Sequence, residues 1–293
     1  MPKKKKLCPP QEKFSVSFNQ YFEQLLNQMK DLQITLIQSD LHWENIDANL
    51  SMFEEKIWQI GGSTDVIILP EMFTTGFSMK ATSLAEIMGL RTTRWMRQMA
   101  DQTGALILGS FIAEVHERYY NRLIWMEPGG QIRTYDKRHL FRMGEENQIF
   151  SPGESLLIGT WKDWRICPLI CYDLRFPVWS RNRWNPALKS MNYDLLVYMA
   201  NWPMVRSAAW ETLLHARAIE NLSYVAGVNR VGIDGNNIEY NGKSGVIGPA
   251  GESMFSIETE EVVKTVTLSA PALQAYRERF PAFLDGDDFS LNN

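Results

Sequence analysis

The stretch CPLICYDLRFP, residues 167–177, joins an apolar run to an abrupt polar segment and carries two cysteines four positions apart. The apolar run begins at Trp164, and a continuous run of this length is typical of a strand that is buried on both faces. The polar segment from Tyr172 predicts a turn into the next helix. Cys171 stands at the junction, where a structural thiol, a metal ligand, half of a disulfide and a nucleophile all fit the local sequence.

Similar runs recur along the chain and alternate with segments of helical period. The strand candidates are residues 32–38, 65–71, 105–115, 122–128, 131–137, 156–159, 164–171, 194–202, 224–231, 245–249 and 262–268. The helix candidates are residues 44–60, 84–103, 178–190 and 206–222, and hairpins are indicated at 128–130 and near 235–237. This order predicts an α/β layered fold, and the lack of a linker or repeat past residue 30 favours one domain, residues 30–293.

The composition excludes several classes of protein. The chain has 293 residues with a formal charge of -4, which gives no indication of a nucleic-acid partner. Three cysteines are too few for a disulfide framework, and without a secretory apolar region they indicate a reducing cytoplasm. No apolar run approaches the roughly 20 residues that cross a bilayer, so no membrane association is expected.

Residues 1–29 form an extension ahead of the domain. The four lysines at 3–6 resemble the start of a signal peptide, but CPPQEK follows where an apolar stretch would be required. Apolar residues at helical spacing in 14–29 fit a short amphipathic helix that docks on the body or on a second subunit. An unstructured basic tail fits the same residues.

Three candidate strands end on a reactive side chain, namely Glu71, Lys137 and Cys171. In open α/β sheets, ligands lie beyond the carboxyl ends of the strands. We therefore predict that a carboxylate, an ammonium and a thiol converge in one crevice.

The spacing of Cys167 and Cys171 removes some alternatives. In a strand that rises about 3.3 Å per residue, they lie roughly 13 Å apart, beyond the ~7 Å between Cα atoms that a disulfide spans. Zinc needs further ligands, and the histidines show no ligand spacing, so neither metal nor cofactor is expected. Cys167 is predicted to be a buried, inert thiol. Cys171 is predicted to be an exposed thiol on a turn, with the Tyr172 backbone N–H beside it as an oxyanion donor.

A nucleophilic thiol needs a base. His215 follows Cys171 in the order of a cysteine–histidine pair, but its segment WETLLHARAIENL (210–222) has the helical pattern of a packing or surface residue. Glu71, behind an apolar run, is the better candidate for the general base. Lys137 then supplies a fixed cation for the negative oxygen of a tetrahedral intermediate.

The motifs LPEMF, YDKRHLF and ICYDLRFP around these three residues resemble the Glu-Lys-Cys signature of the nitrilase superfamily of carbon–nitrogen hydrolases. The similarity runs from about Leu32 to Leu284. Flanking segments such as TTGFSM, ANWP, ARAIEN, GVNRVG and RERFPAFLDGD resemble the bacterial omega-amidase branch. The resemblance implies a four-layer α-β-β-α sandwich, a homodimer, and hydrolysis of the terminal amide of 2-oxoglutaramate or 2-oxosuccinamate.

The family also carries a second glutamate between the lysine and the cysteine. Glu145 and Glu146 compete for this role, and the distance to the Ser151-Pro152-Gly153 turn favours Glu146. The resemblance implies that this residue orients the lysine and assists the base.

Substrate recognition is the least specified part of the sequence. The distal carboxylate of such a substrate needs a cation, and Arg175 is our choice among three arginines near the motifs, the others being Arg142 and Arg206. Pairing of Arg175 with an acid behind the turn is the structural alternative. Phe77, Tyr172 and Trp202 are predicted to line the pocket, and core packing is the default role of such aromatic residues.

Other functions share these motifs. An amidase for deaminated glutathione or an N-carbamoyl compound uses the same three residues, as does an acyltransferase that passes the thioester to an amine. A catalytically silent binding or scaffold subunit is expected to have lost part of the set, and this chain retains all of it.

Overall fold

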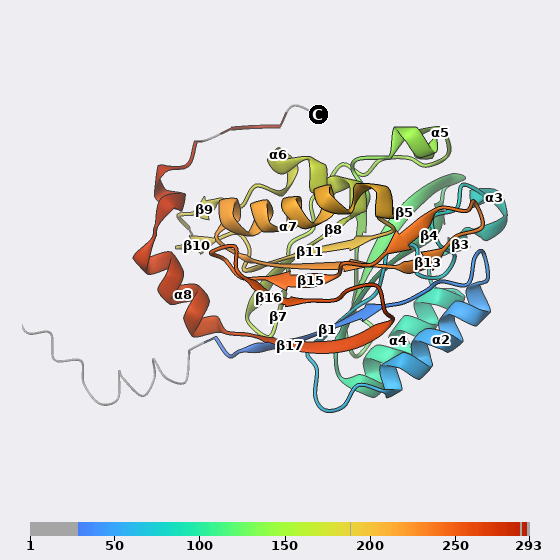
Figure 1. Cartoon of the computed structure of the whole chain (residues 1–293), viewed down its shortest axis with the longest axis horizontal. Coiled ribbons are helices and arrows are strands. Elements are labelled where there is room, and N and C mark those ends of the chain that lie inside the picture. The colour runs from blue at the N-terminus through green and yellow to red at the C-terminus, as the bar shows by residue number, and fades with distance from the viewer. Residues whose placement is uncertain (1–28, 188, 288, 292–293) are drawn as a thin grey trace, which may run out of the picture.

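The structure, a computed structural model, describes residues 29–187, 189–287 and 289–291. Two sheets pack face to face and helices cover their outer faces, so the predicted four-layer α/β sandwich is confirmed (Figure 1). Of the predicted extension, residues 1–29, all but Met29 lie outside the described residues.

The first sheet has the order β17-β1-β2-β4-β5-β6, with β3 paired to β4. Its strands are β1 (Leu32–Gln38), β2 (Val66–Ile68), β3 (Glu86–Ile87), β4 (Leu106–Val115), β5 (Arg118–Met126), β6 (Ile132–Asp136) and β17 (Val262–Leu268). The central strands β1, β2 and β4 are parallel, and β5, β6 and β17 are each antiparallel to a neighbour. Strands β2 and β6 therefore end at the same edge of the sheet.

The second sheet has the order β16-β15-β12-β11-β8-β7, with β8, β11 and β12 parallel. Its strands are β7 (Gly159–Trp161), β8 (Trp164–Ile170), β11 (Leu195–Ala200), β12 (Tyr224–Asn229), β15 (Gly245–Ile247) and β16 (Ser253–Ser256). Two small hairpins stand apart from the sheets, one formed by β9 (Trp184–Asn185) with β10 (Ser190–Met191) and one by β13 (Val231–Ile233) with β14 (Glu239–Asn241).

Figure 1 shows α2 and α4 outside the first sheet and α7 outside the second. The α-helices are α2 (Ile46–Trp58), α3 (Ala81–Leu84), α4 (Arg91–Thr103), α5 (Glu146–Ile149), α6 (Pro177–Ser180), α7 (Ser207–Asn221) and α8 (Ala270–Arg279). The 3₁₀ turns are η1 (Arg142–Gly144), η2 (Cys171–Arg175), η3 (Met204–Arg206) and η4 (Ala282–Asp285).

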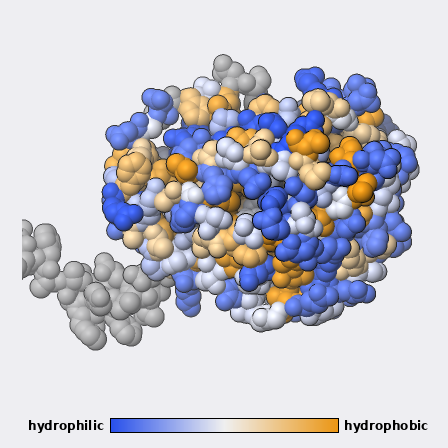
Figure 2. All heavy atoms as spheres, in the orientation of Figure 1, coloured by the Kyte–Doolittle hydropathy of each residue, from blue (hydrophilic) through white to orange (hydrophobic). Residues whose placement is uncertain are grey.

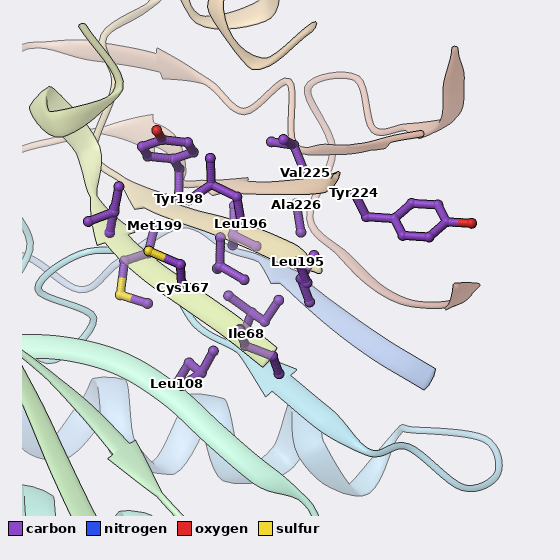
Figure 3. Packing of buried hydrophobic residues seen from close by; sticks show 14 of the residues in the cluster. Ile68, Leu108, Cys167, Leu195, Leu196, Tyr198, Met199, Tyr224, Val225 and Ala226 are labelled. Carbon is purple, nitrogen blue, oxygen red and sulfur yellow. The ribbon is translucent and has the colours of Figure 1, made fainter. Parts of the chain in front are cut away.

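Successive side chains of a strand point to opposite faces of the sheet, so one strand contributes to two apolar layers. In β1, Ile34 and Leu36 belong to the apolar cluster between the sheets, whereas Ile37 packs in a second cluster with Phe53 of α2 and Met96 of α4. Each fully buried side chain of this kind stabilises the fold by about 1.5–3 kcal/mol. Figure 3 shows the layer between the sheets, with Ile68 and Leu108 of the first sheet near Leu195 of the second.

Most expected strands are confirmed, as are the hairpins at 128–130 and 235–237. The helix expected over 178–190 is wrong, because α6 ends at Ser180 and a β9–β10 hairpin follows. Pro186 explains the error, since proline lacks an N–H and disfavours helical backbone in the residue before it. The strand expected over 156–159 shares only Gly159 with β7, and the helix expected from residue 84 begins at Arg91.

Figure 2 shows hydrophilic side chains over most of one face, with smaller hydrophobic groups between them. Within the described part of the chain, no helix is both long and apolar enough to span a bilayer.

Candidate active site

The three strand ends meet at one place. Glu71 follows β2, Lys137 follows β6 and Cys171 follows β8, so both sheets contribute. The Nζ atom of Lys137 lies 2.8 Å from Oε1 of Glu71, and Lys137 and Cys171 line the same cavity. The structure thus brings together the carboxylate, the ammonium and the thiol.

Glu71 is held rigidly in a turn after β2. The backbone N–H of Met72 donates to Oγ of Ser110 at 2.8 Å, and that of Phe73 donates to the Ser110 carbonyl at 3.0 Å. The other oxygen of the Glu71 carboxylate, Oε2, accepts the backbone N–H of Asn201 at 2.8 Å. These bonds hold the turn and one carboxylate oxygen, while Oε1 faces Lys137.

Glu146, at the start of α5, makes the second contact with Lys137. Both of its carboxylate oxygens lie 3.0 Å from Nζ, and Oε2 also accepts the Phe141 N–H at 2.6 Å. Glu145 is instead the residue that precedes α5, in left-handed backbone conformation with φ of 58°. The choice of Glu146 between the two neighbouring acids therefore agrees with the side-chain contacts.

Asn121 completes the cluster and was not identified from the sequence. Its Nδ2 donates to Oε1 of Glu71 at 2.8 Å and to Oε1 of Glu146 at 3.3 Å. Its backbone carbonyl accepts the N–H of Lys137 at 3.0 Å. One side chain in the middle of β5 thus holds the two carboxylates beside the ammonium.

The charges in this cluster depend on one another. Burial alone lowers the pKa of Lys137, but the negative charges of Glu146 and Glu71 outweigh it and raise this pKa well above its usual value. Burial raises the pKa of Glu146 against the opposing effect of Lys137. Lys137 therefore remains an ammonium at neutral pH, as a fixed cation requires.

Cys171 is the first residue of η2, directly after β8, with left-handed backbone at φ of 44°. The expectation that the thiol is exposed is wrong, since the residue is only 8% exposed. Its Sγ lies 3.9 Å from the Asn201 carbonyl, at the end of β11. Burial raises the pKa of the Cys171 thiol, as does the charge of Glu71, while Lys137 lowers it.

Cys167 lies inside β8 and is fully buried among apolar side chains of the second sheet, as Figure 3 shows. Both described cysteines are free in this structure. Burial raises the pKa of the Cys167 thiol, which agrees with an inert thiol. Among the described residues, no cluster of three or more His, Cys, Asp or Glu side chains is placed to hold a metal ion.

His215 lies on α7, away from the thiol. Its Nδ1 lies 2.8 Å from the Gly251 carbonyl, and its side chain lines a different, smaller cavity. A cysteine–histidine dyad is therefore not assembled in this structure.

The cavity beside Cys171 has a volume of about 500 Å³. All four residues expected to contact substrate line it, namely Phe77, Tyr172, Arg175 and Trp202. Glu71 and Glu146 are fully buried behind its lining. Cys171 and Lys137 therefore border the cavity, whereas the two carboxylates lie behind its lining.

Arg175 and Arg206 are the arginines of this cavity, whereas Arg142 lines a neighbouring one. The Arg175 guanidinium lies 4.9 Å from the ring centre of Trp202, and that of Arg206 lies 5.4 Å from that of Phe141. Within the described chain, neither arginine forms an ion pair, so the structural alternative for Arg175, an acid behind the turn, is not seen. Both cations are available to an anionic ligand.

Known proteins share this sequence and architecture. Residues 33–278 match the protein family described as carbon-nitrogen hydrolase. The chain is 48% identical to omega-amidase YafV of Escherichia coli strain K12, over 90% of this chain and 100% of that protein. It is 31% identical to the 2-oxoglutaramate amidase of Bacillus subtilis strain 168, over 86% of this chain and 96% of that protein. The crystal structure of XC1258 from Xanthomonas campestris, a CN-hydrolase superfamily protein, matches with a TM-score of 0.88 and 46% identity, covering 90% of this chain and 100% of that one.

Proposed function

This chain belongs to the carbon–nitrogen hydrolase family, and we propose that it is an omega-amidase that releases ammonia from the terminal amide of 2-oxoglutaramate or 2-oxosuccinamate. The relatives named omega-amidase and 2-oxoglutaramate amidase support this substrate class. The observation that carries the proposal is the Lys137 ammonium, which contacts two buried carboxylates and lines the same cavity as Cys171 and Arg175.

The first half of the reaction forms a thioester. Because burial raises the pKa of Cys171, the resting thiol is protonated and needs a base during attack. Glu71 takes this proton as the sulfur bonds to the amide carbon. Lys137 and the Tyr172 N–H stabilise the negative oxygen of the tetrahedral intermediate. Glu71 then gives its proton to the nitrogen, the C–N bond breaks and ammonia leaves.

The second half restores the enzyme. Glu71 removes a proton from a water molecule, whose oxygen attacks the thioester carbon. The C–S bond then breaks, the sulfur regains a proton from Glu71, and the dicarboxylate leaves. Glu146 and Asn121 act by holding Lys137 and Glu71 in position throughout.

The acyl chain lies along the aromatic wall of the cavity. Arg175 binds its distal carboxylate, since a planar guanidinium suits a carboxylate and this one has no acidic partner among the described residues. Phe77, Tyr172 and Trp202 exclude water around the short chain.

Ammonia release from a panel of amides tests the proposal. We expect turnover of 2-oxoglutaramate and 2-oxosuccinamate, and none from a folded Cys171→Ala variant. An active Cys171→Ala protein contradicts the mechanism. Turnover of N-carbamoyl compounds or deaminated glutathione, with none of the two oxo-amides, contradicts the substrate.

The chemistry and the family of this enzyme support a cellular location, an oligomeric state and a class of reaction partner. A thiol nucleophile has to stay reduced, which supports a cytoplasmic location. Membership of the family supports a homodimer, which light scattering on the purified chain tests directly. A small amide is then the reaction partner, with no nucleic acid or membrane involved.

A further inference from the structure

We propose that Asp173 is a positioning residue, whose buried carboxylate fixes the Lys137 segment against the Cys171 turn. The inference rests on the proposed function, because it concerns the same reaction. Asp173 does not line the cavity beside Cys171, so it acts through its neighbours and not on the substrate.

The Asp173 carboxylate is fully buried and accepts bonds from two directions. On the cysteine side, Oδ2 accepts the backbone N–H of Ile170, the residue before Cys171, at 3.1 Å. On the lysine side, Oδ2 accepts the hydroxyl of Tyr135 at 2.7 Å, and Oδ1 accepts the backbone N–H of His139 at 3.0 Å. The Nδ1 atom of His139 also lies 2.8 Å from Oδ1.

Asp173 and its partners lie on both sides of Lys137 and of Cys171 in the sequence. Tyr135 and His139 lie two residues before and two residues after Lys137, and Ile170 and Asp173 enclose Cys171. We call Asp173, Tyr135 and His139 the clamp. Because β6 and β8 belong to different sheets, the clamp connects the two halves of the sandwich where the site lies between them.

Directional bonds are needed at this place. Apart from contacts such as the Asn201 N–H bond to Glu71, the sheets pack largely through apolar side chains. The attraction between apolar side chains depends weakly on angle, whereas a hydrogen bond prefers a narrow range of distance and angle. An error of about 1 Å between reacting groups costs on the order of 10²-fold in rate. The clamp limits the positional error between the Lys137 ammonium and the Cys171 sulfur.

The hydroxyl of Tyr135 extends the clamp. It accepts the Trp179 indole N–H at 3.0 Å and the Arg138 backbone N–H at 3.2 Å, which orients its own proton toward Asp173. Burial and the neighbouring Asp173 charge raise the pKa of Tyr135, so the hydroxyl stays a donor at neutral pH. In the described chain, Asp173 has no Lys or Arg partner, and the carboxylate is held by O–H and N–H donors.

The test compares Asp173→Asn with Asp194→Asn. Asp194 is also buried, but it pairs with Arg165 and Arg277 near the start of β11, at the other end of the sheet from the site. Two rates are measured on folded protein: ammonia release from 2-oxoglutaramate, and alkylation of Cys171 by iodoacetamide. Urea unfolding reports the stability of each variant.

For Asp173→Asn we expect kcat to fall about 10²-fold, with KM changed by less than about threefold, and alkylation of Cys171 to slow as well. For Asp194→Asn we expect a loss of stability with both rates near those of the wild type. Equal kcat values for the two folded variants overturn the inference. If Asp173→Asn does not fold, Tyr135→Phe replaces it, with an expected fall in kcat of about tenfold, and an unchanged kcat overturns the inference.

The alkylation rate separates this inference from the proposed function. It needs no substrate, so it reports on the position of the thiol even if the wild-type protein releases no ammonia from 2-oxoglutaramate. In that case slower alkylation of the Asp173 variant still supports the clamp, and an alkylation rate equal to that of the wild type overturns it.

Discussion

The Lys137 ammonium lies 2.8 Å from the Glu71 carboxylate, and both side chains are fully buried. Isolated charges are costly to bury, so the Lys137 ammonium depends on the carboxylates of Glu71 and Glu146 that contact it. Substitution of either Lys137 or Glu71 is therefore expected to change both the stability of the fold and the rate of the reaction.

Glu71→Gln tests the base directly. The amide retains the shape of the side chain but cannot accept the thiol proton, so we expect kcat to fall by about 10³-fold or more. Stopped assays of ammonia release measure it. Glu146→Gln is the matched variant, because it removes the other carboxylate that contacts Lys137. For Glu146→Gln we expect a smaller fall in kcat, about 10²-fold. Equal falls in kcat for the two variants argue against a distinct role for Glu71 as the base.

Lys137→Met leaves two carboxylates without their cation. We expect the free energy of unfolding at pH 7 to fall by about 3–5 kcal/mol. The folded pKa of Lys137 lies above its unfolded value of about 10.4. Its contribution is therefore complete below that pH and is lost as the pH rises further.

Urea denaturation of wild type and Lys137→Met across the pH range measures this difference. We expect a constant gap in unfolding free energy between pH 7 and 9, and a narrower one above about pH 10.4. A gap that closes between pH 7 and 9 contradicts the raised pKa of Lys137.

Arg175→Met tests recognition of the distal carboxylate. Loss of a charged hydrogen bond costs about 1.5–3 kcal/mol, so kcat/KM for 2-oxoglutaramate should fall roughly 10- to 150-fold. Butyramide lacks the carboxylate, and its slow hydrolysis should change little. Arg206→Met is the matched control, since Arg206 lines the same cavity. A larger fall in kcat/KM for Arg206→Met than for Arg175→Met would assign binding of the distal carboxylate to Arg206.

The two described thiols should differ in reactivity. Cys171 borders the cavity, whereas Cys167 has no exposed surface. Of these two thiols, peptide mapping after brief iodoacetamide treatment of the native protein should find the label on Cys171 and not on Cys167, with activity lost in proportion to the labelling of Cys171. Cys167→Ser should keep this labelling, and equal slow labelling of both residues favours a silent binding subunit.

The convergence of Glu71 and Lys137 was predictable because strands that run in the same direction present their carboxyl ends at one edge of a sheet. Cys171 follows a strand of the other sheet, so its place beside them depends on how the two sheets pack. Asn121 was not predictable in the same way. It lies within β5, where nothing in the local sequence separates a polar residue that bonds two buried carboxylates from one on a solvated face.

The burial of Cys171 was likewise not predictable from the local sequence. The sequence around it indicates a turn, and turns are usually exposed. The sulfur contacts the Asn201 carbonyl, which follows β11 and lies 30 residues later in the sequence. Such contacts depend on how the strands are ordered in the sheet, which local patterns do not report.

The covalent intermediate is the most direct test of the account. Wild-type protein is mixed with 2-oxoglutaramate, quenched in acid within the first turnovers and examined by peptide mass spectrometry. We expect one 2-oxoglutaryl group in thioester linkage on Cys171, formed together with one ammonia. Ammonia release with no acyl group on Cys171, or an acyl group on another residue, contradicts the central claim.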